Sequence, residues 1–344
     1  MITKGFSVVV CCYNSANRLP ETLKYLSRLQ LPQGLPCELI IVDNACTDNT
    51  AATAASEWRK YRTAIDFKIV EEPEPGLSNA RKKGFIEARY EFVVMCDDDN
   101  WLEHNYLVKT LDVYEKHPEI GVLGGKGFPV CEVDPPEWLK YTKLFATGDQ
   151  AGECGPVATK KVYGAGAVVR KSAYEKLNAV GFESALTDRL KNALSSGNDF
   201  EMCMAIYFAG YEIWFDNTLH FYHFFPKERL STNYYYALIE ASVKCVTILD
   251  GYSLVLFRNR ISKFRINNYL IKQLVHSKKE YYHFKKLSVQ HSKTSGFGIF
   301  VRFRMRYFSL RIKGIVSDYG RIFTYASNAL ELKKKLRRMN DVAK

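Results

Sequence analysis

The sequence has no long hydrophobic run, which excludes the simplest kind of membrane protein. A membrane-spanning helix needs about 20 consecutive apolar residues. The best candidate, residues 236–257, is interrupted by Glu240, Lys244 and Asp250. The N-terminal apolar run is short and lacks a small-residue cleavage site, so we expect no signal peptide. These absences predict a chain without a transmembrane helix.

Paired cysteines are also missing. No two of the nine cysteines form a Cys-x-x-Cys pair, which argues against a zinc site and against a disulfide framework. Several lie inside apolar, strand-like runs, as buried reduced thiols do in cytosolic proteins. We therefore predict a cytoplasmic location and free thiols at positions 11, 12, 37, 46, 96, 131, 154, 203 and 245.

Glycine is absent where two common nucleotide-binding folds require it. The first apolar run continues as CCYNSANRL, so it lacks the glycines that let a dinucleotide approach the backbone. A Gly-x-x-x-x-Gly-Lys-Ser/Thr loop is missing as well. Backbone amides are therefore not expected to cradle a phosphate here. The alternative way to bind a diphosphate is a metal ion that bridges it to carboxylates.

The first hundred residues alternate short apolar runs with helical patterns. Such alternation predicts right-handed βαβ units and hence an α/β fold with a mostly parallel sheet. Ligands of such sheets bind beyond the carboxyl ends of the strands. Polar residues that follow the runs are therefore expected to meet at one edge. The expected strands are 7–12, 38–42, 67–70 and 92–96.

Three aspartates follow the fourth apolar run. Asp97, Asp98 and Asp99 come where that strand should end. Three adjacent negative charges are unfavourable unless solvent, a basic side chain or a cation compensates them. Hard oxygen ligands suit Mg²⁺ or Mn²⁺ bound together with substrate phosphates. An ordinary solvated acidic turn is the alternative that the triplet alone leaves open.

Seven sequence blocks stand in a characteristic order along the chain. They are SVVVCCYN (7–14), ELIIVDNACTDNT (38–50), GLSNARKKG (76–84), VMCDDDNWL (94–102), YGAGAVVRK (163–171), SGNDFEMC (196–203) and HFFPKERLS (223–231). Taken together, they resemble a family-2 glycosyltransferase of the GT-A fold, of the kind that builds bacterial polysaccharides. The resemblance covers roughly residues 5–232, and it implies a GT-A domain over residues 1–232, a Rossmann-like sheet flanked by helices.

The resemblance implies transfer of a sugar from a nucleotide-diphosphate donor to an acceptor hydroxyl, with inversion and with Mn²⁺ or Mg²⁺ as cofactor. The expected acceptor is a saccharide or a lipid-linked saccharide, in the synthesis of a surface polysaccharide or glycolipid. Two alternatives stay open from the residues alone. One is a nucleotidyltransferase-like enzyme, and the other is an inactive nucleotide-sugar-binding module.

The resemblance also assigns roles to individual residues. In the Asp-x-Asp pattern, Asp99 would hold the metal, with His223 as a further ligand. Asp98 is counted with the donor site, although its side chain is expected to point the other way and to be dispensable. The nucleotide-sugar-binding residues are expected to be Tyr13, Asn14, Asp43, Arg81, Asp97 and Asp98.

Asp199 matches the catalytic base. Single-displacement inversion requires a carboxylate that takes the proton of the attacking hydroxyl. The expected position just inside a helix would fix Asp199, and the helix dipole would lower its pKa. Glu201, two residues further on, is the rival base. Asn198 stands where many relatives have a glutamate.

Residues 233–344 are expected to form a mostly helical, basic region. Residues 251–344 carry 22 Lys and Arg against 4 Asp and Glu. Basic amphipathic helices suit anionic membrane surfaces, so we expect peripheral attachment to the inner face of the cell membrane and no nucleic-acid partner. Three alternatives stay open: a helix packed on the catalytic domain, an oligomer contact through an apolar stripe, and a nucleic-acid-binding tail. The apolar stripe in question is Tyr325, Ala329, Leu332, Leu336 and Met339.

Overall fold

The computed structural model describes residues 2–142, 145–186 and 196–342. They fall into two compact units, each described by itself. The sheet unit takes in residues 2–130, 146–186 and 198–224. The helical unit takes in residues 131–142, 145, 196–197 and 225–342.

One half of the sheet is parallel, as the sequence predicts. Its strands lie in the order β3-β2-β1-β4, and all three pairings are parallel. Strands β1, β2 and β4 contain nearly continuous apolar runs that are buried on both faces, as central parallel strands require, whereas the edge strand β3 is more polar and half-exposed. Their bounds are β1 Thr3–Cys12, β2 Cys37–Asn44, β3 Asp66–Glu72 and β4 Tyr90–Asp97.

The other half of the sheet is antiparallel and continues from β4 in the order β8-β6-β9-β5, with β7 beside β9. Strand β9 is the longest of this half, with 14 residues. The bounds are β5 Asn100–Leu102, β6 Ile120–Cys131, β7 Gly155–Pro156, β8 Val168–Arg170 and β9 Glu212–Phe225.

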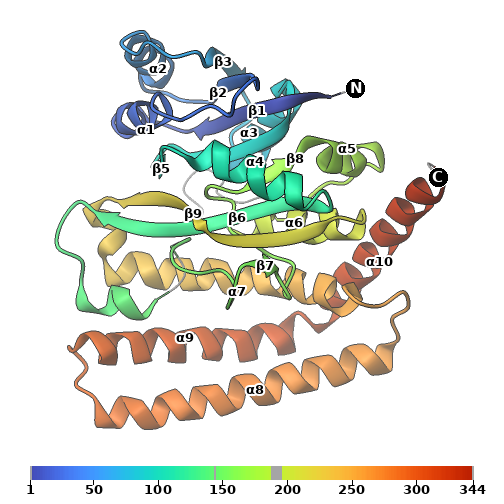
Figure 1. Cartoon of the computed structure of the whole chain (residues 1–344). Coiled ribbons are helices and arrows are strands. Elements are labelled where there is room, and N and C mark those ends of the chain that lie inside the picture. Colours follow the sequence, from blue (N-terminus) through green and yellow to red (C-terminus); the bar gives the residue numbers. More distant parts are fainter. Residues whose placement is uncertain (1, 143–144, 187–195, 343–344) are drawn as a thin grey trace. The chain divides into compact units, whose positions relative to one another are not determined.

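Helices cover both faces of the parallel half (Figure 1). One buried cluster joins apolar side chains of α1, α2 and α4 to alternate residues of β1 and β2, such as Val8 and Leu39. The opposite face carries α3. There a Cβ on Gly84 would lie 2.3 Å from Val9 Cγ1, so only glycine permits this close approach. The bounds are α1 Leu19–Leu26, α2 Thr50–Trp58, α3 Leu77–Glu87, α4 Tyr106–Lys116, α5 Lys171–Ala179 and α6 Asn198–Phe208.

The helical unit consists mainly of four long helices. Helix α9 packs against both α7 and α8, and α10 packs against α7 (Figure 1). Ser231, Ser262 and Ser295 each cap a helix by accepting a backbone N–H. The bounds are α7 Thr232–Val255, α8 Lys263–Gln290, α9 Gly296–Ser317 and α10 Tyr319–Val342, with short 3₁₀ turns at Glu137–Tyr141 and Lys227–Leu230.

The apolar stripe predicted along α10 does not form a free surface. Ala329 and Leu336 are fully buried, and α7 approaches so closely that a Cβ on Gly251 would lie 2.7 Å from Tyr325 Cβ. Lys333 Nζ donates to the carbonyl oxygens of Val255, Leu256 and Arg258 at 2.8–3.0 Å. The stripe packs inside the protein because α7 offers it a complementary face. In the described residues, every helix is too short or too polar to cross a membrane.

Candidate active site at the carboxyl edge of the parallel strands

The strand register brings the polar residues after β1, β2 and β4 to one edge. Cys12 lies beside Asp43 of β2, and Cys11 lies beside Asp97 of β4. These residues are more than 30 positions apart in the chain, and the parallel pairing alone unites them. The expectation that they meet at one edge is therefore confirmed.

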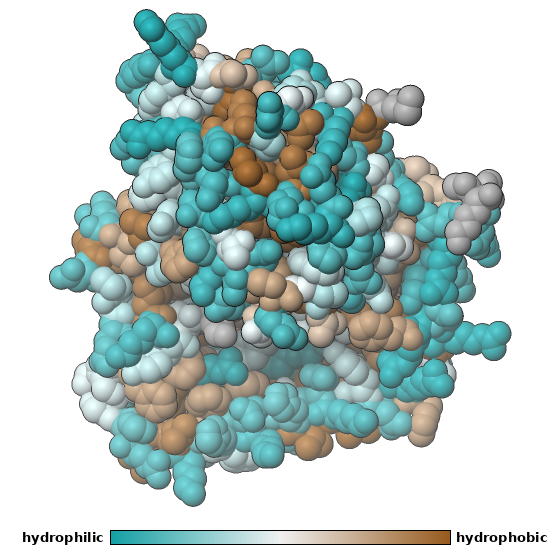
Figure 2. Space-filling model, viewed as in Figure 1, coloured by the Kyte–Doolittle hydropathy of each residue, from teal (hydrophilic) through white to brown (hydrophobic). Residues whose placement is uncertain are grey.

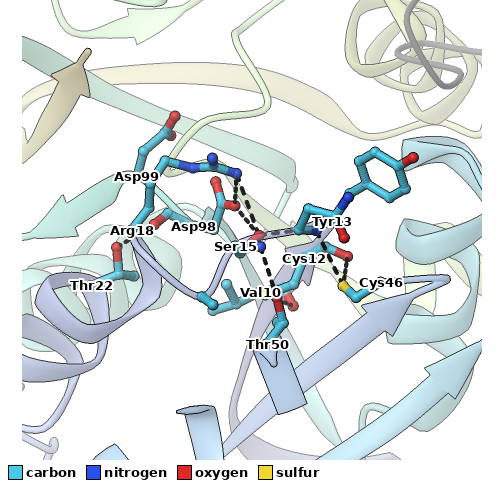
Figure 3. Close-up of polar contacts among 12 residues, drawn as sticks. Val10, Cys12, Tyr13, Ser15, Arg18, Thr22, Cys46, Thr50, Asp98 and Asp99 are labelled. Carbon is cyan, nitrogen blue, oxygen red and sulfur yellow. Dashed lines mark hydrogen bonds and ion pairs between the residues drawn. The ribbon is translucent and has the colours of Figure 1, made fainter. Parts of the chain in front are cut away.

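Asp98 holds the turn that follows β1. Its Oδ2 accepts a hydrogen bond from Ser15 Oγ and pairs with Arg18 Nη2 at 2.6 Å (Figure 3). Its carbonyl oxygen accepts from Thr22 Oγ1 at 2.8 Å. Burial, together with the charge of Asp99, raises the pKa of this carboxyl, and Arg18 opposes the shift. Asp98 is thus a buried part of the framework, and its dispensability for activity stays a prediction.

Asp99 and His223 are brought together by an antiparallel pairing. Strand β5 pairs with β9 so that Asn100 lies opposite His223. His223 Nε2 is 3.4 Å from Asp99 Oδ1, and both side chains are largely buried. Asn100 Nδ2 also donates to Asp99 Oδ1 at 3.2 Å. The predicted metal-binding pair therefore lies at one point of the edge.

This pair fits an open metal site. A carboxylate oxygen and an imidazole nitrogen are suitable donors for a divalent cation such as Mn²⁺. Within the described residues, no group of three or more His, Cys, Asp and Glu side chains is arranged to hold a metal by itself. A cation bound here would need water or substrate oxygens to complete its coordination, as nucleotide-dependent metal sites do.

Asp97 and Arg81 line a small pocket on the α3 side of β1 and β4. Cys11 and Phe85 are among its other walls. Arg81 is largely buried in the first half of α3. Burial raises the pKa of the Cys11 thiol to about 12, so this sulfur stays protonated and unreactive. The pocket therefore offers one carboxylate and one guanidinium as its charged groups.

Asp199 lies at the start of α6, next to Arg81. Its Oδ2 accepts from the backbone N–H of Gly164 at 2.7 Å, and its Oδ1 accepts from that of Phe200 at 2.9 Å. Burial raises the pKa of Asp199 and outweighs the opposing effects of Arg81 and of the two N–H donors, while Asp97 raises it further. The backbone N–H groups thus lower the pKa, the direction expected of a helix N-terminus, but burial is the larger effect and the net shift is upward.

Glu201 is not available as the rival base. It is almost completely buried, and its carboxylate accepts from Ser184 Oγ at 2.5 Å, Leu186 N at 3.0 Å and Ala185 N at 3.2 Å. Glu201 thus fixes the loop over 184–186. Asn198 Nδ2 donates to the carbonyl oxygen of Leu186 at 3.2 Å, so Asn198 supports the same loop.

Asn14 and Asp43 are engaged with the backbone at the edge. Asn14 has a left-handed backbone with φ of +50°, and its Oδ1 accepts from Thr47 N at 2.8 Å. Asp43 Oδ1 accepts from Cys46 N at 3.0 Å. Both side chains thus shape the loops around the site.

Tyr13 differs from these residues because its side chain is exposed to 44%. The ring points away from Asp98, Ser15 and Arg18 (Figure 3). An exposed ring at the carboxyl edge is able to stack on a flat ligand. Tyr13 therefore remains a candidate for contact with a nucleobase.

Sequence reasoning missed two residues of the site. Arg18, the partner of Asp98, gives no local signal because the pair is separated by 80 positions. Gln150 accepts from the Tyr163 N–H at 2.5 Å and donates to the Gly125 carbonyl at 2.7 Å. It thereby holds the segment that carries Gly164, and nothing in its sequence surroundings indicates this.

The sequence of this edge matches a known family. Residues 7–177 fit the family model described as glycosyl transferase family 2. Residues 7–177 are a family 2 glycosyltransferase domain. A poly-beta-1,6-N-acetyl-D-glucosamine synthase of Staphylococcus epidermidis is 30% identical over 123 residues, which cover 36% of this chain and 28% of that protein. The chain thus spans less than a third of this relative.

Two solved structures share the fold. The mannosyltransferase PcManGT of Pyrobaculum calidifontis, solved with GDP-Man and Mn²⁺, gives a TM-score of 0.53 at 18% identity, over 99% of this chain and 81% of that chain. Residues 1–349 of S. aureus TarS, solved with UDP-GlcNAc, give 0.50 at 16% identity, over 92% of each chain. The chain has the GT-A fold, a mostly parallel α/β sheet flanked by helices, and it continues into a helical C-terminal region.

Proposed function

We propose that the chain is an inverting, metal-dependent glycosyltransferase, which moves a sugar from a nucleotide-diphosphate donor to an acceptor hydroxyl. One observation carries the proposal. Asp199, with its raised pKa, lies at the start of α6 beside Arg81 and near Asp97, in the same sheet unit that holds the Asp99–His223 pair. The sheet unit thus holds a base (Asp199), a positively charged side chain (Arg81) and a metal-binding pair (Asp99 and His223).

In the proposed reaction, the acceptor oxygen forms a bond to the anomeric carbon while the bond from that carbon to the diphosphate breaks. Asp199 takes the proton of the acceptor hydroxyl. A raised pKa makes the carboxylate a stronger base than an ordinary aspartate, which favours this transfer. The two backbone N–H groups on its oxygens fix the direction in which it points.

Asp99 and His223 would hold the divalent cation. The cation would neutralise the charge of the diphosphate as it departs. Arg81 adds a second positive charge in the neighbouring pocket, and Asp97 would contact the donor from the same pocket. The exposed ring of Tyr13 would stack on the nucleobase, and Asp43 would accept from the base or the ribose. Asp98 and Asn14 would act indirectly by holding the loops.

The donor class and the setting are part of the proposal. The compared structures contain UDP-GlcNAc in one case and GDP-Man with Mn²⁺ in the other, which supports a nucleotide-sugar donor and a divalent metal. The similar synthase supports a saccharide acceptor in polysaccharide synthesis. A lipid-linked saccharide acceptor, in polysaccharide or glycolipid synthesis, is our further proposal. We propose that the reaction takes place in the cytoplasm, at the inner face of the cell membrane.

Nucleotide release tests the function. Purified protein is incubated with a panel of nucleotide sugars and Mn²⁺, and the released nucleoside diphosphate is measured. We expect slow release with the matching donor, and loss of release in Asp99→Ala. Asp112→Asn is the matched control, because Asp112 is an exposed surface residue of α4, and it should behave as the wild type.

Asp199→Asn separates catalysis from binding. We expect the variant to keep the thermal shift produced by donor plus Mn²⁺, and to lose transfer to an acceptor by about 10²–10⁴-fold. Full transfer by Asp199→Asn would overturn the assignment of the base. Donor binding without any release by the wild type would instead indicate a binding module.

A further inference from the structure

An apolar stripe runs along the outer side of α8. Five large side chains recur at intervals of seven and four residues, which places them on one side of a helix with 3.6 residues per turn. Each is more than half exposed, so the stripe is uncovered within the helical unit. The five are Phe264 (73% exposed), Ile271 (57%), Val275 (61%), Tyr282 (64%) and Val289 (86%).

The opposite side of α8 holds the helix in place. Ile266, Leu270 and Ser277 are buried, and Arg304 of α9 lies over the Phe284 ring, 5.4 Å from its centroid. Packing against α9 therefore fixes which side of α8 faces outward. In Figure 1, α8 is the outermost helix of its unit, and in Figure 2 apolar patches interrupt the hydrophilic surface along the same edge.

Basic side chains flank the stripe. Helix α8 carries seven Lys and Arg and a single acidic residue, Glu280. At 100° per residue, Lys278 and Lys285 lie on one flank, and Lys272, Lys279 and Lys286 lie on the other. An apolar line between two rows of ammonium groups is the pattern of a helix that lies flat in the interface of an anionic bilayer.

We propose that the outer face of α8 docks the protein on an anionic lipid surface. The apolar line would enter the boundary between headgroups and acyl chains, and the lysines would contact lipid phosphates. Charge decides against a second copy of this chain as the occupant, because two such faces would bring two strongly basic helices together. The inference assigns the membrane contact to α8 instead of α10, whose stripe residues are buried or half-buried. Only the link between this docking and a lipid-linked acceptor rests on the proposed function.

Vesicle flotation of the full chain tests the proposal, without nucleotide sugar. Wild type is mixed with neutral phosphatidylcholine vesicles or with vesicles containing phosphatidylglycerol, and we expect flotation only with the latter. Ile271→Ser/Val275→Ser/Tyr282→Ser removes apolar side chains without changing charge. Lys278→Gln/Lys279→Gln/Lys286→Gln removes charge only. Each should reduce the partition coefficient by about tenfold or more.

Matched controls separate the helix face from net charge. Lys334→Gln/Lys335→Gln/Arg337→Gln removes three exposed charges from α10, and Ile86→Ser/Val133→Ser removes exposed apolar side chains elsewhere. Both should float as the wild type does. Equal losses in the charge control and the α8 charge variant would overturn the proposal. So would a wild type that does not float, or that floats equally well with neutral vesicles.

Two further measurements test whether the α8 face contacts lipid or a second copy of the chain, and whether flotation is independent of catalysis. A wild-type dimer in light scattering that dissociates on loss of the α8 apolar residues would show the face to be an interface between copies, which also overturns the proposal. Asp199→Asn should float normally. Failure of the glycosyltransferase assignment would therefore leave the flotation result unchanged, and the two hypotheses can fail separately.

Discussion

The backbone N–H of Gly164 donates to the Asp199 carboxylate, and the two residues fit together without spare room. A Cβ on Gly164 would lie 3.0 Å from Arg81 Nη2 and 3.2 Å from Asp199 Cβ. A methyl group at this position would therefore crowd both Asp199, the proposed base, and the guanidinium of Arg81. The contact gives a direct way to test whether the position of Asp199 matters.

Gly164→Ala should lower kcat for sugar transfer by about tenfold, because a small displacement of a positioned base slows the reaction. KM for the donor should change less. Steady-state kinetics with saturating donor would measure the effect. Gly152→Ala is the matched control, because its Cβ would meet no atom within 4 Å. Unchanged kcat in Gly164→Ala would contradict a catalytic role for this contact.

The pH profile of transfer should report the environment of Asp199. The base acts deprotonated, so its raised pKa predicts that kcat/KM falls with decreasing pH earlier than an ordinary aspartate would require. Arg81→Gln removes a positive charge and should move this acidic limb to higher pH. Asp97→Asn removes a negative charge and should move it to lower pH. Shifts in the same direction for both variants would exclude Asp199 as the titrating group.

His223→Ala should weaken metal binding by about 10–100-fold. The measurement is the Mn²⁺ concentration that gives half-maximal nucleotide release. His220→Ala is the matched control on the same strand, since its Nε2 contacts the carbonyl oxygen of Asn217. Equal Mn²⁺ requirements in the wild type and His223→Ala would remove this histidine from the metal site.

Arg18→Gln should destabilise the protein by about 1–3 kcal/mol, because it leaves the buried carboxylate of Asp98 without its cation. Asp98→Asn should be less harmful in the Arg18→Gln background than alone. Urea denaturation of the single and double variants gives this coupling. The exposed pair Lys116 and Asp112 serves as the control, with an expected coupling of at most about 1 kcal/mol.

Lys333→Met should loosen the contact of α10 with α7. The substitution removes the donor from three carbonyl oxygens at the end of α7 while keeping the apolar stem. We expect a loss of about 1–3 kcal/mol in the free energy of unfolding. Thermal unfolding beside Lys334→Met, at an exposed position, would measure it. Equal melting temperatures for the two variants would contradict the role of Lys333.

The parallel half of the fold and the composition of its edge could be predicted from the sequence. Runs such as those of β1 and β4 are local signals, and the βαβ rule converts them into a shared edge that holds Asp43 and Asp97. Asp199 and Glu201 could not be separated, because both lie in the first turn of one helix. Their difference arises from the loop over 184–186, which donates three hydrogen bonds to the carboxylate of Glu201.

The two apolar stripes of the C-terminal region show a second feature that the sequence alone does not predict. Those of α8 and α10 have similar spacing and similar basic flanks. Only packing decides that α10 is covered, because Gly251 lets α7 approach it. Whether a stripe is buried depends on its neighbour, and the helix's own sequence does not contain that information.

The tie between Asn14 and Thr47 has a consequence for ligand binding. It joins the turn after β1 to the loop after β2, while Asp98 and Arg18 fix the other end of the same turn. The two loops that would flank a nucleotide are therefore ordered by the fold itself. A ligand arriving there would lose little affinity to loop ordering, since that entropy is already spent in folding. The donor should therefore bind to loops that already have their bound conformation.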